Sequence, residues 1–200
     1  MKIYGLTGGI ACGKSTVSHF FRELGAAVVD ADAASRLVMQ AGHPTYAAVV
    51  DLFGKEILHK EGQINREALG QIVFNDAQKR TQLEQLTHPA IRMEVAQQLS
   101  EAAQKGIPIG MVEAALLIEN GSYRQYAGLI VVSCHPDIQR QRLMQRNQMT
   151  EAEAQKRIDS QWPLAQKEAF ADWLIRNDSD LGALRAQTNA VWEALTDMLP

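Results

Sequence analysis

The feature that most constrains this chain is a glycine-rich octapeptide near its start, Gly8-Gly9-Ile10-Ala11-Cys12-Gly13-Lys14-Ser15. It fits the pattern G-x-x-x-x-G-K-[ST]. An apolar run at residues 3–6 predicts a β-strand before it, and residues 15–24 predict a helix after it that ends at Gly25. A glycine-rich turn between a strand and a helix is the setting of a phosphate-binding loop. The chain is therefore expected to fold around a strand–loop–helix unit that binds a nucleoside triphosphate.

The residue types of this loop suit a triphosphate. Glycines allow a tight turn whose backbone N–H groups point at phosphate oxygens, and the helix that follows adds its positive N-terminal end. Lys14 is expected to reach the β- and γ-phosphates, and Ser15 to offer its hydroxyl to Mg²⁺. A chance glycine turn before a capped helix is the alternative. The expected ATP-binding residues of the loop are Gly8, Gly9, Ala11, Cys12, Gly13, Lys14, Ser15 and Thr16.

Composition excludes several other classes. The 200 residues are 46% apolar and 22% charged, which is ordinary for a globular domain. A net charge of −3 argues against a basic nucleic-acid binder, and the two cysteines argue against a disulfide framework. The chain lacks an apolar run of about 18 residues, so we expect no membrane partner, no nucleic-acid partner and a cytoplasmic location.

Short apolar runs alternate with helical patterns, which predicts an α/β fold with a five-stranded parallel sheet. The predicted strands cover residues 3–6, 27–29, 107–112, 129–132 and 173–175, and helices are expected at residues 136–147 and 181–198. Residues 32–105 predict a helical insertion, with helices at 46–53, 67–74, 78–86 and 90–103. Residues 140–170 predict a helical lid, and the core domain comprises residues 1–31, 106–139 and 171–200.

A carboxylate follows the second predicted strand. Asp32 lies where parallel strands present their carboxyl ends to a ligand, and it could accept a proton from a substrate hydroxyl. The alternative is that Asp32 caps a helix over residues 33–39, with Arg36 as its partner one turn later.

A cluster of arginines lies in the predicted lid. Arg142 and Arg146 share a helix face, whereas Arg140 points elsewhere. Phosphoryl transfer needs cations that close over the γ-phosphate, and a helical lid could supply them. A solvated basic face is the alternative.

Together these residues resemble the dephospho-coenzyme A kinase family from residue 6 to about residue 184. The matching pieces are Leu6-Thr7-Gly8-Gly9-Ile10, Gly13-Lys14-Ser15, Val29-Asp30-Ala31-Asp32 with Arg36, His88-Pro89 with Ile91, Leu116-Leu117 with Glu119, Arg142, Arg146, Arg157-Ile158, Gln161, and Ile175 with Asn177. The resemblance implies a nucleotide-monophosphate-kinase-like fold. It also implies transfer of the ATP γ-phosphate to the ribose 3′-hydroxyl of dephospho-CoA.

The resemblance also assigns roles to individual residues. Asp32, Lys14 and Arg142 become catalytic, and Ser15 becomes the Mg²⁺ ligand. Arg142, Arg146 and Asn177 join the ATP-binding set, and the expected contacts to the acceptor substrate are Asp32, Arg36, His88 and Leu116. A packing role for His88 is the alternative to a direct contact. ATP and dephospho-CoA are the expected partners, and the chain is expected to be a monomer or a weak homo-oligomer. Another small-molecule kinase of this fold and a non-catalytic nucleotide-binding module are the competing functions.

Three features are not explained by the family pattern. Ala11 carries a methyl group where glycine is commoner, so its φ is expected to be negative. Cys12 lies near a helix N-terminus and a lysine, which predicts a lowered pKa and a reactive thiol, with Cys134 reacting slowly; inert packing of Cys12 is the alternative. Glu113 could assist Mg²⁺ through water, although a solvated strand end is the simpler interpretation.

Tyr46, Phe53 and Phe74 of the predicted insertion are expected either in its core or along the substrate slot.

Overall fold

The computed structural model describes residues 1–199 and contains one five-stranded sheet in the order β2-β3-β1-β4-β5. Its strands are β1 (Lys2–Gly8), β2 (Ala27–Asp30), β3 (Ile109–Glu113), β4 (Leu129–Ser133) and β5 (Trp173–Arg176). Strand β1 pairs in parallel with β3 and β4, and β4 pairs in parallel with β5. The predicted five-stranded parallel sheet is confirmed.

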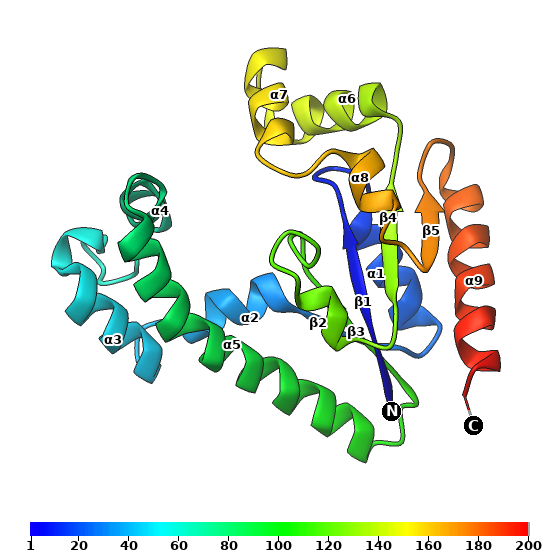
Figure 1. The fold of residues 1–200 in the computed structure, drawn as a ribbon, viewed down its shortest axis with the longest axis horizontal. Coiled ribbons are helices and arrows are strands. Elements are labelled where there is room, and N and C mark those ends of the chain that lie inside the picture. Colours follow the sequence, from blue (N-terminus) through cyan, green and yellow to red (C-terminus); the bar gives the residue numbers. More distant parts are fainter. Residues whose placement is uncertain (200) are drawn as a thin grey trace. The chain divides into compact units, whose positions relative to one another are not determined.

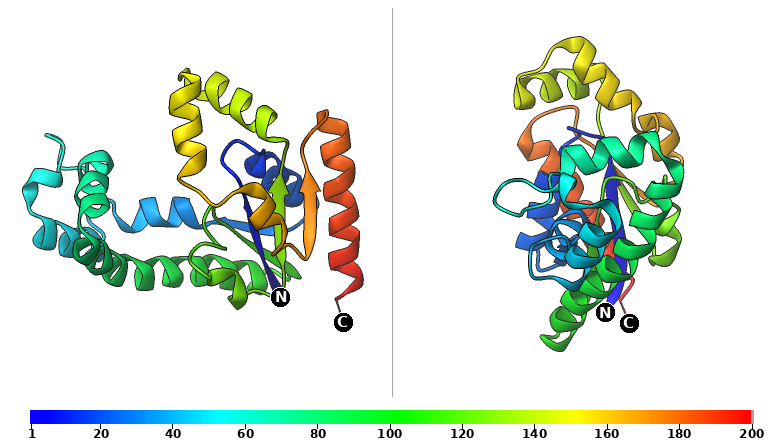
Figure 2. Two further views of the ribbon diagram at one scale, coloured as in Figure 1. Left: turned by 45° about the horizontal axis from the view of Figure 1, so that its top comes forward. Right: turned by 90° about the vertical axis from the view of Figure 1, so that its left-hand side faces the viewer.

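Nine α-helices and two short 3₁₀ turns connect and flank these strands in the described chain. The helices are α1 (Lys14–Glu23), α2 (Ala31–Val38), α3 (Pro44–Phe53), α4 (Arg66–Asn75), α5 (Ala77–Gln104), α6 (Pro136–Asn147), α7 (Glu151–Asp159), α8 (Leu164–Glu168) and α9 (Leu181–Asp197). The 3₁₀ turns cover Lys55–Ile57 and Ser122–Gln125. Helix α9 runs alongside the edge strand β5 and also packs on α1 (Figures 1 and 2).

The register of the sheet places the phosphate loop. Leu6 of β1 lies opposite Glu113 at the end of β3, and Gly8 lies opposite Val132 of β4. A Cβ atom on Gly8 would come within 2.3 Å of the Val132 carbonyl oxygen, so only glycine fits there. The loop that leaves β1 therefore begins close against its neighbouring strand.

The chain divides into two compact units, each with its own apolar core. The first comprises residues 1–29 and the described residues from Glu101 onward, and the second is Asp30–Ser100. The core of the first lies between the sheet and helices α1 and α9, with Tyr4, Leu6, Phe21, Ile130 and Leu195 among its buried side chains. The core of the second gathers Val49, Phe53, Ile57, Ile64 and Leu69.

The insertion differs from the sequence prediction at Pro89. The two helices predicted at 78–86 and 90–103 form the single helix α5, with Pro89 inside it (Figure 1). Proline removes one backbone hydrogen bond. The helix-favouring residues on both sides outweigh that loss, and the C-terminal half of the helix buries Leu99 and Ala102.

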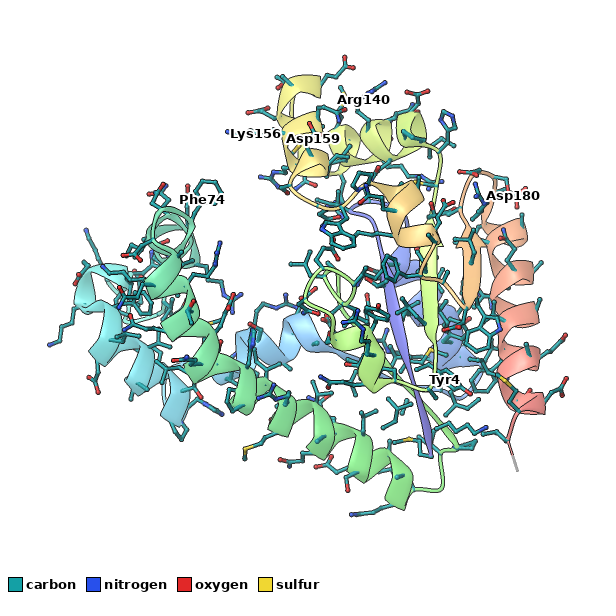
Figure 3. All side chains as sticks on the ribbon, in the orientation of Figure 1. Tyr4, Phe74, Arg140, Lys156, Asp159 and Asp180 are labelled. Carbon is teal, nitrogen blue, oxygen red and sulfur yellow. The ribbon has the colours of Figure 1, made fainter. Side chains whose placement is uncertain are left out.

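The aromatic residues of the second unit have different environments. Phe53 is buried and Tyr46 packs against the same core, its hydroxyl donating a 2.5 Å hydrogen bond to the Gly62 carbonyl oxygen. Phe74 is 86% exposed, so a core position for it was wrong (Figure 3). The preceding residues Ile72 and Val73 pack against the cluster, whereas the side chain of Phe74 is directed to solvent.

Among the described residues, no helix is long and apolar enough to cross a bilayer.

Candidate active site

The phosphate loop joins β1 to α1 through two residues with positive φ. Gly13 has φ +94°, and a Cβ atom there would come within 2.2 Å of Asn177 Nδ2. Ala11 has φ +61°, so the expectation of a negative φ for Ala11 was wrong. The geometry of the turn outweighs the cost of placing a methyl group in this region, which is about 1–2 kcal/mol.

Three buried or half-buried carboxamides hold the backbone of this loop. Gln139 of α6 donates to the Ile10 carbonyl oxygen, and Gln161 accepts from the Ile10 N–H, each at 2.9 Å. Asn177, which follows β5, donates to the Cys12 carbonyl oxygen at 2.9 Å. These contacts fix the loop from three separate segments, which preorganises it for a ligand.

The sequence pointed to only two of these three carboxamides. The family resemblance included Gln161 and Asn177, whereas no sequence signal pointed to Gln139. Gln139 is buried although it lies in a highly polar helix. The signal was absent because its partner, Ile10, lies 129 positions earlier in the chain.

Lys14 forms an ion pair with Glu113, the last residue of β3. Its Nζ lies 2.5 Å from Glu113 Oε1, and Ser18 donates a hydrogen bond to Glu113 Oε2 at 2.5 Å. Glu113 is only 5% exposed, and Arg22 lies 3.9 Å from its carboxylate. The interpretation of Glu113 as a solvated strand end was wrong, because it is the counter-charge of the loop lysine.

The start of α1 is open to an anion. Gly13 occupies the N-cap position, and no side chain caps this helix. Backbone N–H groups at an uncapped helix start favour negative charge. Ser15 is exposed at the same place, one residue after Lys14.

The surroundings of Ser15 suit Mg²⁺ bound through a nucleotide. Within the described residues no group of three or more His, Cys, Asp or Glu side chains is placed to hold a metal ion. Mg²⁺ is commonly held by one or two protein oxygens together with phosphates and waters. An exposed hydroxyl beside an anion-binding helix start fits that mode, whereas a metal site built from protein ligands alone does not.

Of the two aspartates where β2 meets α2, Asp30 and not Asp32 is the helix cap. Asp30 caps α2, accepting from the Ala33 N–H at 2.9 Å, and Arg36 lies 3.5 Å from its carboxylate. Asp32 lies in the first turn of α2 and is exposed. The interpretation of Asp32 as the cap of this helix was therefore wrong, because Asp30 occupies the N-cap position.

The arginines of α6 differ in what they contact. Arg142 donates from Nη1 to the Asn177 carbonyl oxygen at 2.9 Å and from Nη2 to Asn177 Oδ1 at 3.4 Å. It is thereby joined to the carboxamide that holds Cys12. Arg146 is exposed and donates from Nε to Oδ1 of its neighbour Asn147 at 2.9 Å. Arg140 forms ion pairs with Asp137 and Glu151, on the outer side of α6 and α7 (Figure 3).

The remaining predicted substrate residues are on the surface. His88 is exposed on α5, where it borders a hollow of about 350 Å³ together with Pro89 and Arg92. Leu116, in the segment after β3, is also exposed. The packing alternative for His88 has no support in its surroundings.

Cys12 is not a reactive loop thiol of the predicted kind. It is fully buried, and its Sγ lies 3.3 Å from Cys134 Sγ. The hydrogen bond with Cys134 and burial both raise the pKa of Cys12 above its ordinary value. The pKa of Cys134 is lowered instead, chiefly by its hydrogen bond with Cys12. The prediction of a lowered pKa for Cys12 was wrong, because the side chain turns into the core.

A phosphate loop between β1 and α1, a lysine at an uncapped helix start and a parallel sheet flanked by helices define a P-loop protein that binds a nucleoside triphosphate.

Comparison with known proteins narrows this class to one family. The dephospho-CoA kinase family model matches residues 2–182. Dephospho-CoA kinases of Bacillus anthracis and Geobacillus kaustophilus are 41% and 43% identical, over 94% and 96% of both this chain and theirs. The dephospho-CoA kinase structure from Campylobacter jejuni has a TM-score of 0.71 and 29% identity, and the match covers 98% of each chain. The chain belongs to the dephospho-CoA kinase family, and transfer of the ATP γ-phosphate to the 3′-hydroxyl of dephospho-CoA is its reaction.

Proposed function

We propose that the loop and the start of α1 bind the ATP phosphates and that Asp32 activates the acceptor hydroxyl. The observation that carries this proposal is the uncapped N-terminus of α1, where Lys14 and the exposed Ser15 stand together. Backbone N–H groups there bind phosphate oxygens, and the Lys14 ammonium stabilises charge on the group in transfer.

Ser15 is the residue that would hold Mg²⁺. When bound, the ion would neutralise negative charge on the phosphate oxygens. The Ser15 hydroxyl would hold it beside the loop, whose backbone is supplied by Gly8, Gly9, Ala11, Cys12, Gly13 and Thr16.

Asp32 is the proposed general base. Its carboxylate would accept the proton of the 3′-hydroxyl as the oxygen attacks phosphorus. Support comes from its exposed position in the first turn of α2 and from the finding that Asp30, not Asp32, caps that helix. Arg36, His88 and Leu116 are proposed to contact the acceptor, since all three are exposed.

Arg142 is proposed to stabilise the transferring phosphoryl group, and Arg146 and Asn177 to complete the ATP site. Arg142 has support in its direct link to Asn177 and through it to the loop. Arg146 is the most exposed of the three, so its contact would depend on movement of the predicted lid.

An assay of ADP release across a panel of acceptors tests the proposed substrates and metal. We expect turnover that requires both dephospho-CoA and Mg²⁺, with AMP and adenosine far poorer. Binding of the remote part of the acceptor positions the reacting hydroxyl, which the shorter molecules cannot provide. Equal turnover of AMP and dephospho-CoA would contradict the acceptor assignment, and full activity in a chelator would contradict the metal assignment.

A further inference from the structure

The phosphate loop contains one member of a buried cysteine pair. Cys12 belongs to the loop, and Cys134 follows β4. Their Sγ atoms lie 3.3 Å apart, and both thiols are free. A disulfide has an S–S length of about 2.05 Å, so the two sulfur atoms would have to approach by about 1.2 Å to bond.

We propose that Cys12 and Cys134 form a reversible intramolecular disulfide with hydrogen peroxide as oxidant, and that this bond inactivates the phosphate loop. Only the activity measurement in the test below depends on the family's kinase reaction. The bond itself is detected by mass.

Cys134 is suited to react first with the oxidant. It is 5% exposed, whereas Cys12 is 0% exposed. The hydrogen bond with Cys12 is the main cause of the lowered pKa of Cys134, burial opposes it, and the nearby Arg142 guanidinium adds to the lowering. Asp178 acts in the opposite direction as a nearby negative charge. A thiolate is the form of cysteine that attacks peroxide.

The chemistry balances in two steps. The Cys134 thiolate attacks one peroxide oxygen, the O–O bond breaks, and the leaving hydroxide takes up the thiol's proton as water. Cys12 sulfur then attacks the sulfur of the Cys134 sulfenic acid, the S–O bond breaks, and a second water leaves. Two thiols have lost two hydrogen atoms, and one hydrogen peroxide has been reduced to two waters.

The bond would act on the loop through the Cys12 backbone. The Cys12 carbonyl oxygen accepts from Asn177, and its N–H donates to the Gly9 carbonyl oxygen at 3.2 Å. Gly13 and Lys14 follow directly in the chain. Drawing Sγ of Cys12 toward β4 strains these contacts and displaces the groups that bind phosphate.

The experiment treats the reduced full-length chain with hydrogen peroxide and then divides the sample. Mass mapping of one half should show the Cys12–Cys134 crosslink and the loss of two hydrogen atoms. ADP release by the other half should fall by about a hundredfold, the loss that follows a misplacement of about 1 Å in a catalytic site. Dithiothreitol should restore it. Activity of the untreated chain tests the kinase reaction separately.

Cys134→Ser and Cys12→Ser are the matched variants, and each is judged by the ratio of its activity after and before peroxide. Both ratios should stay near one. If Cys12→Ser binds ATP poorly because it alters the loop, Cys134→Ser still tests the proposal, since its substitution lies outside the loop. A crosslink that forms without loss of activity would overturn the proposal that the disulfide inactivates the phosphate loop. Failure to form the crosslink, or an activity loss that persists in Cys134→Ser, would overturn the disulfide as its cause.

Discussion

The ammonium of Lys14 lies 2.5 Å from Glu113 Oε1, and the other carboxylate oxygen of Glu113 accepts a hydrogen bond from Ser18. The lysine that the loop motif assigns to the phosphates thus has a fixed carboxylate partner within the protein. If Lys14 binds the triphosphate as we propose, the nucleotide competes with that carboxylate for the ammonium, and the pair would link the stability of the apoprotein to nucleotide binding.

Replacing Glu113 with Gln should lower the free energy of unfolding by about 1–3 kcal/mol, because Lys14 and Ser18 lose a charged partner in a buried place. Saturating MgATP should recover part of the loss, because the triphosphate supplies negative charge to the same lysine. Thermal unfolding with and without MgATP measures both effects. The nucleotide-induced rise in Tm should be larger for Glu113→Gln than for the natural chain.

Glu23→Gln is the matched control. Glu23 pairs with Arg185 on the surface, at 2.8 Å, and takes no part in the loop. Its replacement should leave the response to nucleotide unchanged, because the pair lies outside the loop. It should also change stability little, because exposed ion pairs contribute little to the free energy of unfolding. An equal nucleotide response in Glu113→Gln and the natural chain would show that no such competition occurs.

The second prediction concerns Gly13. An alanine at position 13 would place its Cβ within 2.2 Å of Asn177 Nδ2, and the fold would force it to adopt a φ of +94°. We expect Gly13→Ala to weaken ATP binding and lower stability, because both the strain and the displaced carboxamide affect the loop. Gly25→Ala has the same backbone strain, at φ +102°, and its Cβ would meet no described atom within 4 Å apart from its chain neighbours.

Calorimetric titration with ATP and chemical denaturation of the two glycine variants separate these effects. Gly25→Ala should cost only the backbone term, about 1–2 kcal/mol, and should keep its affinity for ATP. If Gly13→Ala bound ATP as tightly as Gly25→Ala does, contact with Asn177 would not matter for the loop.

Local patterns in the sequence predicted most of the fold. The loop motif and the apolar strand runs each depend on residues a few positions apart. Such short-range signals also place the five strands within a few residues of their observed bounds. Pro89 misled the prediction because a local rule for ending helices does not weigh the helix-forming residues around it.

The candidate site was predicted less completely because its contacts are long-range. Glu113 meets Lys14 across 99 positions, and Cys134 meets Cys12 across 122. Contacts between residues so far apart along the chain leave no periodic signal in the sequence. The positive φ of Ala11 was missed for a related reason, since the three carboxamides that hold the loop come from distant segments.

The third prediction tests Asp32 against its neighbour. Asp32→Asn keeps the shape of the side chain but removes the proton acceptor, so kcat should fall by about 10²–10⁴-fold while ATP binding is retained. Asp30→Asn is the matched control, because asparagine also serves as an N-cap. It should keep both stability and turnover.

Steady-state ADP release and ATP titration of the two variants decide this assignment. Near-normal kcat in Asp32→Asn would remove Asp32 from the role of base. A comparable loss in Asp30→Asn would instead transfer that role to Asp30, whose carboxylate caps α2 at 2.9 Å from the Ala33 nitrogen.

The last prediction separates a direct role of Arg142 from a role through Asn177. If the Arg142 guanidinium stabilises the transferring phosphoryl group, Arg142→Ala should lower kcat more than it weakens ATP binding. Asn177→Ala removes the hydrogen bond to the Cys12 carbonyl oxygen. It should weaken ATP binding more than it lowers kcat, because it loosens the loop.

Arg140→Ala provides the control for loss of positive charge on α6, since Arg140 pairs with Asp137 and Glu151 instead. Single-turnover rates and ATP dissociation constants for the three variants and for the Arg142→Ala/Asn177→Ala pair complete the test. Additive effects of the pair on the free energy of activation would indicate two separate roles. A double variant no worse than Asn177→Ala alone would show that Arg142 acts only by holding Asn177 against the loop.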